Sequence, residues 1–123
     1  MHHKSVITMM NFQQQMRILH WQTTSYARHN AYGIIYDSLD DLIDTFTETC
    51  MGKYGRIELN DEISELKLKN MKDVSINNYL NQFCDFLIDL TNEFDGKEDT
   101  DILNIRDEIL GAVNKLKYLL TLK

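Results

Sequence analysis

Residues 20–48 read HWQTTSYARHNAYGIIYDSLDDLIDTFTE, and this stretch decides how the chain folds. It begins with His20, passes through a run rich in hydroxyl side chains at residues 23–27, and reaches a second histidine at His29. Serine and threonine side chains compete with the helical backbone for hydrogen bonds, so this run is predicted to form a tight reversal. Two antiparallel helices are therefore expected on either side of it, at residues 5–22 and 28–51.

Apolar residues recur at three- and four-residue steps on both sides of the reversal, as they do in amphipathic helices. In the first helix the expected inward residues are Val6, Met9, Met10, Phe12, Met16, Leu19 and Trp21. In the second helix they are Tyr32, Ile35, Leu39, Leu42, Ile43, Phe46 and Cys50. Residues 74–94 and 100–121 repeat the pattern, with Gly96 as a stop between them. Gly111 in the last segment is predicted to mark a close contact between helices.

Four amphipathic segments predict an all-α fold, because each segment must bury its apolar stripe against the others. All 123 residues are expected in one domain. The connection at residues 53–72 is long for so small a bundle, and a short helix near 61–68 is predicted within it. Such a link allows the second and third helices to run parallel, as in ferritin-like four-helix bundles. An up-down-up-down bundle with an irregular loop is the alternative.

Composition argues against several classes of function. The net charge is −6, so the chain lacks the basic field that drives non-specific binding to nucleic acid, and we expect no nucleic-acid partner. No run of residues reaches the length of a membrane span, and we expect neither a membrane anchor nor an N-terminal leader. Cys50 and Cys84 lie in apolar helical patterns and are expected as buried free thiols. The expected location is cytoplasmic, in a host cell or with a virion if the source is viral.

Four carboxylates follow one side of the second predicted helix: Asp37, Asp41, Asp44 and Glu48. At about 100° per residue they fall within an arc of roughly 60°, opposite the apolar face. Gly33 lies on the same side, where it has no side chain to obstruct the close approach of a second helix. Taken alone, such a stripe is a solvated helix face. Combined with two imidazoles, it offers the oxygen and nitrogen donors that suit iron.

The histidines and the distal carboxylates cannot share a metal ion within one chain. The reversal places the imidazoles of His20 and His29 at the same end of the bundle, but Asp44 lies fifteen residues beyond His29. That interval is ~22 Å along a helix axis, whereas metal–ligand bonds are about 2 Å long. An antiparallel pairing of residues 28–51 from two copies removes the gap and forms two equivalent sites per homodimer. On its own, His20 is better explained as a half-buried histidine bonded to a backbone carbonyl.

The register of these residues resembles the ferroxidase signature of Dps-like miniferritins. The residues that carry the resemblance are Leu19-His20-Trp21, His29, Tyr36-Asp37, Asp44 and Glu48. The resemblance implies an iron site at a dimer interface, di-iron or mononuclear, with ferroxidase chemistry. In this interpretation the two histidines come from one chain, and the partner supplies Asp44 and Glu48.

The same resemblance assigns roles to the residues around those ligands. Asp37 and Asp41 would guide cations or surround the ligands, and Trp21 would pack beside the site. Three features depart from the miniferritin pattern. The interval between the histidines is three residues shorter, Gly33 stands where that family usually has a carboxylate ligand, and the lysine-rich N-terminal extension is missing. DNA binding and a twelve-subunit shell are therefore not implied.

A second resemblance is closer locally. Small uncharacterised proteins of phages and large DNA viruses carry the patterns HWQT, SYARH and GKYGR, which occur here at residues 20–23, 25–29 and 52–56. This resemblance carries no known activity. It favours a rival hypothesis in which a non-catalytic bundle uses the same face to dimerise or to bind a partner. The turn that bears Arg28 and residues 52–56 would then be the contact points.

Overall fold

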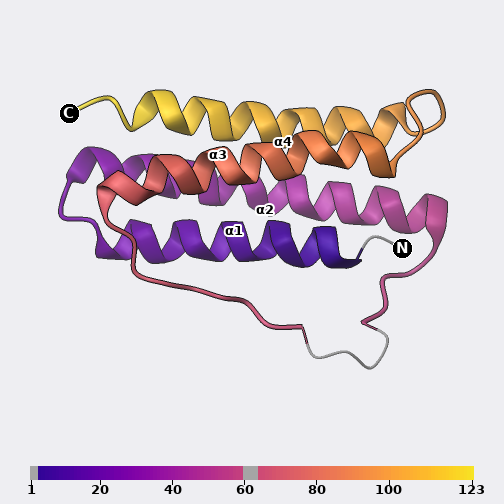
Figure 1. Cartoon of the computed structure of the whole chain (residues 1–123), viewed down its shortest axis with the longest axis horizontal. Coiled ribbons are helices and arrows are strands. Elements are labelled where there is room, and N and C mark those ends of the chain that lie inside the picture. The colour runs from indigo at the N-terminus through magenta and orange to yellow at the C-terminus, as the bar shows by residue number, and fades with distance from the viewer. Residues whose placement is uncertain (1–2, 60–63) are drawn as a thin grey trace.

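The computed structural model describes residues 3–59 and 64–123, and these residues form a bundle of four helices (Figure 1). The helices are α1 His3–Gln22, α2 Tyr26–Tyr54, α3 Asp73–Asp89 and α4 Thr100–Leu119, with a short 3₁₀ helix, η1 Leu90–Glu93, directly after α3. The described ranges contain no strand. The all-α prediction is therefore confirmed.

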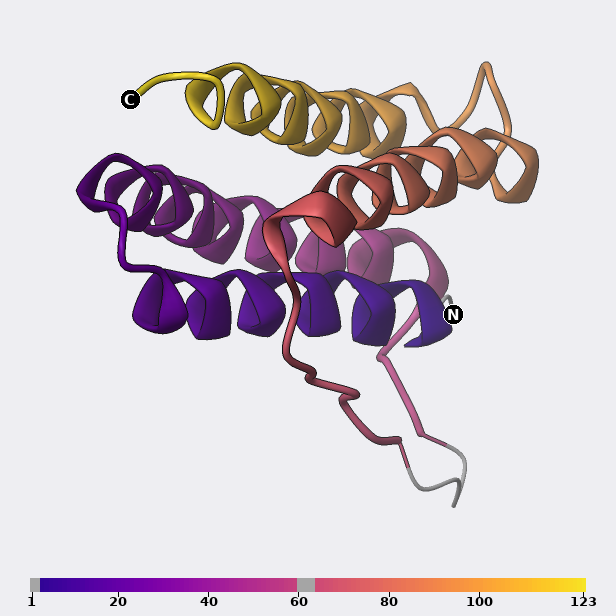
Figure 2. The ribbon, with the colours of Figure 1, turned by 60° about the vertical axis from the view of Figure 1, so that its left-hand side comes forward.

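The order of the helices in space follows from the long connection between α2 and α3. α1 and α2 form an antiparallel hairpin, and the chain then returns along the outer side of α1 before α3 begins (Figures 1 and 2). As a result α3 runs parallel to α2, and α4 runs antiparallel to α3. This is the crossover arrangement predicted from the length of the link, and the up-down-up-down alternative is wrong.

One apolar stripe from each helix builds the core. The buried members from α1 are Met9, Phe12, Met16 and Leu19. The predicted inward residues of α2 are all buried except Leu42, which packs at the margin. Two predictions for α1 are wrong, since Met10 is 40% exposed and Trp21 is 65% exposed. Met10 follows the fully buried Met9 and so points away from the core, while Trp21 lies against the guanidinium of Arg17, 5.4 Å from its ring centroid.

Both cysteines are free and buried, as predicted. Burial raises the pKa of the Cys50 thiol to about 11. Because the thiolate is the reactive form, this thiol stays protonated and inert near neutral pH.

Side chains of α1 hold the connection between α2 and α3 against the outside of that helix. Asn11 Oδ1 accepts a hydrogen bond from the Lys67 N–H at 2.6 Å. Gln15, which is fully buried, accepts from the Lys69 N–H at 3.0 Å and donates to the Lys69 carbonyl at 2.8 Å. These bonds occupy backbone groups that a helix would need. The predicted short helix is accordingly absent from residues 64–68, and the rest of that prediction lies outside the described residues.

The predicted helix at 74–94 is divided, because a buried arginine from α4 reaches the end of α3. Arg106 Nη1 donates to the Leu87 carbonyl at 2.8 Å and to Thr91 Oγ1 at 2.9 Å, while its Nε donates to Asp107 at 2.8 Å. A positive charge is favourable beside the last carbonyls of a helix. The arginine thus fixes the point at which α3 tightens into η1.

Gly111 does not mark a close helix contact, contrary to the prediction. A Cβ atom at this position would meet no other heavy atom within 4 Å. The residue lies on an exposed side of α4, where a glycine has no packing role.

The C-terminal end of α2 is fastened to the loop before α4 by a buried carboxylate. Asp99 accepts hydrogen bonds from the Tyr54 hydroxyl at 2.5 Å, from Lys53 Nζ at 3.2 Å and from the Asp95 N–H at 2.8 Å. Lys53 also bonds Asp101 at 2.8 Å. We call these five residues the Asp99 network, and it fixes the end of α2 that lies opposite the histidines.

The Asp99 network depends on ionised carboxylates. The Tyr54 hydroxyl, followed by the Asp95 N–H, lowers the pKa of Asp99, and Lys53 lowers the pKa of Asp101. The hydrogen bonds from Lys53 to Asp101 and Asp99 raise the pKa of Lys53. A carboxyl whose pKa is lower in the folded state stabilises the fold above its unfolded pKa, and this contribution is lost as the pH falls through the folded pKa. The network is therefore weakest in acid.

Asp99→Asn should lower the free energy of unfolding at neutral pH, because the charge that Tyr54 and Lys53 bind is removed at constant size. It should also make stability fall less between about pH 5 and pH 3, where the wild-type carboxyls gain protons. Urea denaturation across this range measures both effects, with the exposed Glu108→Gln as the matched control. A variant with the wild-type pH dependence would contradict this account of the network.

Candidate metal centre

His20 and His29 bind each other's backbone. His20 Nδ1 lies 2.6 Å from the His29 carbonyl oxygen, and His29 Nδ1 lies 2.8 Å from the His20 carbonyl oxygen. The two rings stack with centroids 3.8 Å apart and planes 18° from parallel. We call this arrangement the histidine pair. Its two residues are half-buried at the end of the bundle where α1 ends and α2 begins.

The hydrogen bonds fix the tautomer of both rings. A carbonyl oxygen only accepts, so each Nδ1 must carry a proton and donate it. The remaining nitrogen, Nε2, is then the unprotonated one in the neutral ring and can bind a metal ion. Histidines that bind metals commonly donate their other ring N–H to a backbone carbonyl, which orients the ring. The sequence left open whether His20 is a ligand or a histidine bonded to a carbonyl, and its geometry satisfies both descriptions.

The local sequence explains why the pair forms. Residues 23–25 make a three-residue turn, and Ser25 caps α2 by accepting the Arg28 N–H on its hydroxyl at 3.2 Å. The Thr23 N–H bonds the Leu19 carbonyl at 3.0 Å, which completes the last turn of α1. These hydrogen bonds pair backbone groups at the end of α1 and at the start of α2, and the two histidines face each other across the turn. The reversal predicted for residues 23–27 is confirmed, with α2 beginning at Tyr26.

Gly33 provides the space for the ring of His20. A Cβ atom at residue 33 would lie 3.2 Å from His20 Cε1 and 3.4 Å from His20 Nδ1, which is tighter than an ordinary contact. A larger side chain would have to displace the ring. The sequence indicated that Gly33 lacks a carboxylate ligand and leaves room for the close approach of a second helix, whereas in the structure the room beside Gly33 is occupied by the ring of His20.

The four carboxylates of the stripe are all exposed on α2. Because α2 is continuous from Tyr26 to Tyr54, the ~22 Å separation between His29 and Asp44 holds. One chain therefore brings the two histidines together but does not bring Asp44 or Glu48 to them. Within residues 3–59 and 64–123, no group of three or more histidine, cysteine or acidic side chains could hold a metal ion.

Arg17 is a residue of this face that the sequence reasoning missed. Its guanidinium lies 3.8 Å from the ring centroid of Tyr36 on α2 and 5.4 Å from that of Trp21 on α1. A hydrogen bond from Arg17, followed by one from Gln14, lowers the pKa of Tyr36. The four-residue spacing between Arg17 and Trp21 was the available signal. Trp21 was expected to pack beside the site, and the ring contact that it makes is with this arginine.

The contact points of the rival hypothesis are engaged within the chain. Arg28 donates to the Tyr32 hydroxyl at 3.3 Å and lies 3.8 Å from the Asp73 carboxylate. In residues 52–56, Lys53 and Tyr54 belong to the Asp99 network, and Gly55 ends α2 with φ at +93°, which glycine adopts readily. These patterns therefore have internal structural roles.

Comparison with known proteins places this geometry in a family. Residues 20–120 match the family of unknown function DUF5856. The chain belongs to this family. The matched part of the DUF5856 chain begins at His20 and ends at residue 120, so it includes the histidine pair, its turn, α2, α3, the Asp99 network and all of α4.

A curated relative comes from a bacteriophage. It is the uncharacterized 14.6 kDa protein in the mobD-ri intergenic region of Enterobacteria phage T4, 33% identical over 106 residues, which are 85% of this chain and 75% of the relative. The predicted relationship to phage proteins is thereby confirmed, while the likeness to miniferritins stays a prediction. No solved structure matches the DUF5856 chain. Among the described residues, no helix has the length and apolar character needed to cross a membrane.

Two glycine substitutions test the role of Gly33. Alanine favours a helix interior over glycine by roughly 1 kcal/mol, so Gly111→Ala should stabilise the protein by about that amount. Gly33→Ala should gain less, or destabilise, because the new Cβ presses on a ring held by a 2.6 Å hydrogen bond. Thermal and urea unfolding compare the two variants. An equal gain at both positions would show that Gly33 is not required by His20.

Proposed function

We propose that this protein is a homodimer that binds iron at two equivalent sites between its subunits. In each site, His20 and His29 of one copy bind through Nε2, and the partner subunit contributes Asp44 and Glu48. Asp37 and Asp41 guide cations toward the site or surround the ligands. The proposed activity is oxidation of Fe(II) to Fe(III), in which each iron gives one electron to dioxygen or a peroxide.

The observation that carries the proposal is the histidine pair. Both rings are oriented by Nδ1 bonds to carbonyl oxygens at 2.6 and 2.8 Å, as ligands of a metal ion commonly are. Fixing the rings in the unliganded chain removes part of the entropy that a metal site otherwise loses on binding. Imidazole and carboxylate together suit Fe(II), and carboxylates favour Fe(III) after oxidation.

The charges of α1 and α2 support pairing between two copies. The histidine end of the hairpin also holds Arg17 and Arg28, while residues 37–48 of α2 carry the exposed carboxylates. An antiparallel pairing of two α2 helices about a twofold axis sets each basic end against the partner's acidic stretch. Such complementary ends guide association and fix the register.

The second candidate is a non-catalytic bundle that dimerises or binds a partner through the same face. The observation that favours it is again the histidine pair, because reciprocal bonds to carbonyls stabilise the turn without any metal ion. The glycine at residue 33 and the absence of a third ligand within the described part of one chain also agree with it. The two candidates differ in their response to metal.

Asp44→Asn with Glu48→Gln is the cleanest test, since both side chains are exposed and the changes keep their size. The wild type should melt several degrees higher with Fe(II) under anaerobic conditions, or with Zn(II) or Co(II), because a ligand bound only by the native dimer stabilises it by mass action. The double variant should lose this gain, whereas a matched control, Glu98→Gln with Glu108→Gln, should keep it. Equal gains in all three proteins would contradict the proposed ligands.

Mixing two inactive variants tests whether the site is shared. His20→Ala/His29→Ala chains and Asp44→Asn/Glu48→Gln chains should each lack metal stabilisation. Their heterodimer holds one intact site, so the response should partly return after subunit exchange. Admission of air to the Fe(II)-loaded wild type should then raise the near-ultraviolet absorbance in proportion to the sites. If exchange is demonstrated by mass spectrometry and no response returns, the intersubunit assignment is wrong.

A further inference from the structure

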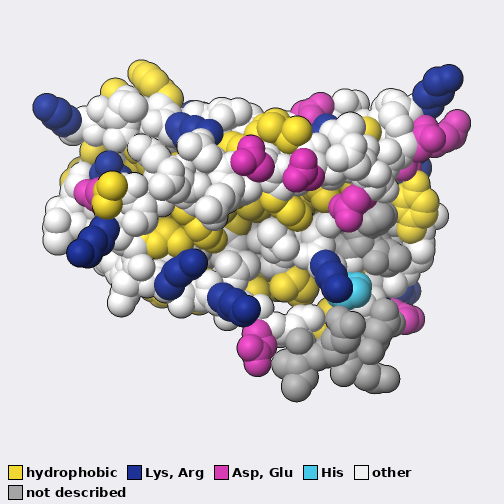
Figure 3. Space-filling view, viewed as in Figure 1, with side chains coloured by type: hydrophobic (Ala, Val, Ile, Leu, Met, Phe, Trp, Pro, Cys, Tyr) yellow, Lys and Arg dark blue, Asp and Glu magenta, His cyan; other side chains and the backbone are white. Residues whose placement is uncertain are grey.

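A groove runs along α3 from Ser75, bordered by residues 69–71 of the connection at its first hollow and by α1 at the next two. It consists of three hollows of about 280, 200 and 530 Å³ that share lining residues. Tyr79 and Gln82 line both the first and the second hollow, and Thr8, Gln82 and Phe86 line both the second and the third. The three hollows are therefore neighbours along α3. Figure 3 shows hydrophobic side chains at the surface in the region between these two helices.

Aromatic rings form the floor of this groove. Phe12 of α1 stacks on Phe83 of α3 with centroids 3.8 Å apart, and on Tyr79 at 5.7 Å. Phe86 continues the row at 5.6 Å from Phe83. Tyr79 and Phe86 are only partly buried, so they leave apolar surface open to solvent. The large rings of α1 and α3 meet beneath the groove, and smaller polar side chains line the edges of the groove.

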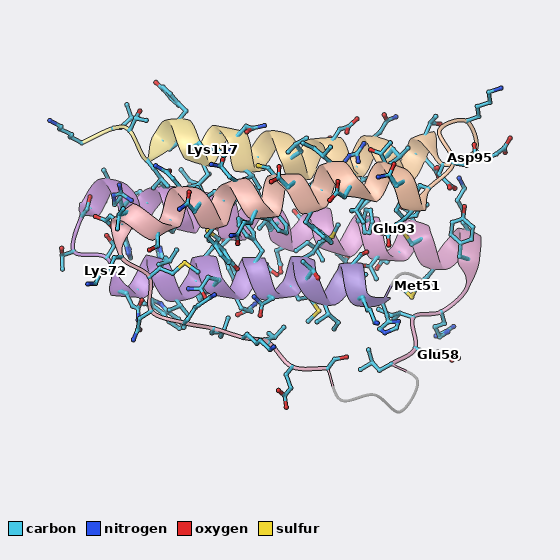
Figure 4. All side chains as sticks on the ribbon, in the orientation of Figure 1. Met51, Glu58, Lys72, Glu93, Asp95 and Lys117 are labelled. Carbon is cyan, nitrogen blue, oxygen red and sulfur yellow. The ribbon has the colours of Figure 1, made fainter. Side chains whose placement is uncertain are left out.

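The two ends of the groove differ in charge. Asp85, Asp89 and Glu93 line its largest hollow at four-residue steps, and among the described residues that line this hollow Lys4 is the one cation. Glu93 also accepts a hydrogen bond from Ser5 at 3.3 Å. At the opposite end Lys69 lines the groove. Figure 4 shows Lys72 and Glu93 near these opposite ends of α3.

We propose that this groove binds an amphipathic helix of a partner protein, with apolar side chains on the aromatic floor and basic side chains against the carboxylates of α3. A helix is the fitting form because the second and third hollows lie between α1 and the α3–η1 segment, which are helices whose backbone groups are already paired. An extended peptide would leave its own backbone unpaired over the apolar floor, whereas a helix satisfies its own hydrogen bonds. Residues 75–93 span ~27 Å at 1.5 Å per residue, the length of a helix of about eighteen residues.

The charge of the groove also sets the direction of the bound helix. The N-terminus of a helix carries a partial positive charge and the C-terminus a partial negative one. The partner's N-terminus therefore lies at the Glu93 end and its C-terminus at the Lys69 end, so it runs parallel to α1. No residue of α2 lines the groove. This site is thus separate from the proposed iron site and does not rest on it.

A synthetic peptide tests the proposal with fluorescence anisotropy. The probe is an eighteen-residue labelled helix with leucines at three- and four-residue spacing and lysines on its flanks. It should bind saturably to the wild type, and a version with glutamate in place of lysine should bind roughly tenfold more weakly. A scrambled peptide of the same composition should not bind. Equal binding of the scrambled peptide, or no saturable binding of the probe up to about 1 mM, would overturn the proposal.

Variants of the protein locate the binding. Asp85→Lys with Asp89→Lys should weaken binding of the probe roughly tenfold, because it reverses the charge of the rim. Gln82→Trp, at an exposed position that lines all three hollows, should block it. The control Glu98→Lys with Glu108→Lys makes the same change in net charge outside the groove and should bind as the wild type does. Circular dichroism confirms that each variant is folded, and equal affinities for all of them would contradict the assignment to this groove.

Discussion

The reciprocal hydrogen bonds between His20 and His29 are the constraint on which much of this structure depends. Each ring donates to the other residue's carbonyl, so the bonds fix the end of α1, the start of α2 and the register between the two helices. The stacked rings favour a residue without a side chain at Gly33, because a Cβ atom there would lie 3.2 Å from His20 Cε1. With the hairpin set in this way, one side of α1 carries the Asn11 and Gln15 bonds that hold the connection, and another side faces α3.

The long helix α2 is fastened by polar contacts at both ends and by apolar contacts between them. At its far end the buried carboxylate of Asp99 binds Tyr54 and Lys53, so the helix is joined there to the loop before α4. Its outward side is then free to carry the exposed acidic stripe. This separation of roles gives the proposed dimer its form, because one end of α2 presents oriented imidazoles and the remainder presents carboxylates. α3 is attached differently, through Arg106 of α4 and through the ring of Phe12 on α1, and that looser attachment leaves the groove.

Helical periodicity predicted the number of helices and most of their buried residues, and the length of the connection predicted the crossover, because all of these follow from spacing along the chain. The prediction from periodicity failed where the structure depends on contacts with another part of the molecule. Spacing alone could not tell that Met9 is buried and its neighbour Met10 exposed, and it could not place Arg106 at the end of α3. For the site, the reversal correctly predicted both imidazoles at one end of the bundle. The stacking and the reciprocal bonds could not be predicted, because they depend on side-chain conformations and on the contact between His20 and Gly33.

The tautomers of the two histidines test the central claim most directly. Long-range ¹H–¹⁵N correlation spectra of histidine-labelled protein at about pH 8, above the ordinary titration range of this side chain, report which ring nitrogen carries the proton. The structure predicts that both rings are protonated at Nδ1 and unprotonated at Nε2, since each Nδ1 donates to a carbonyl oxygen. A spectrum with the proton on Nε2 of either ring would contradict the reciprocal pair, and with it the oriented nitrogens on which the proposed iron site depends.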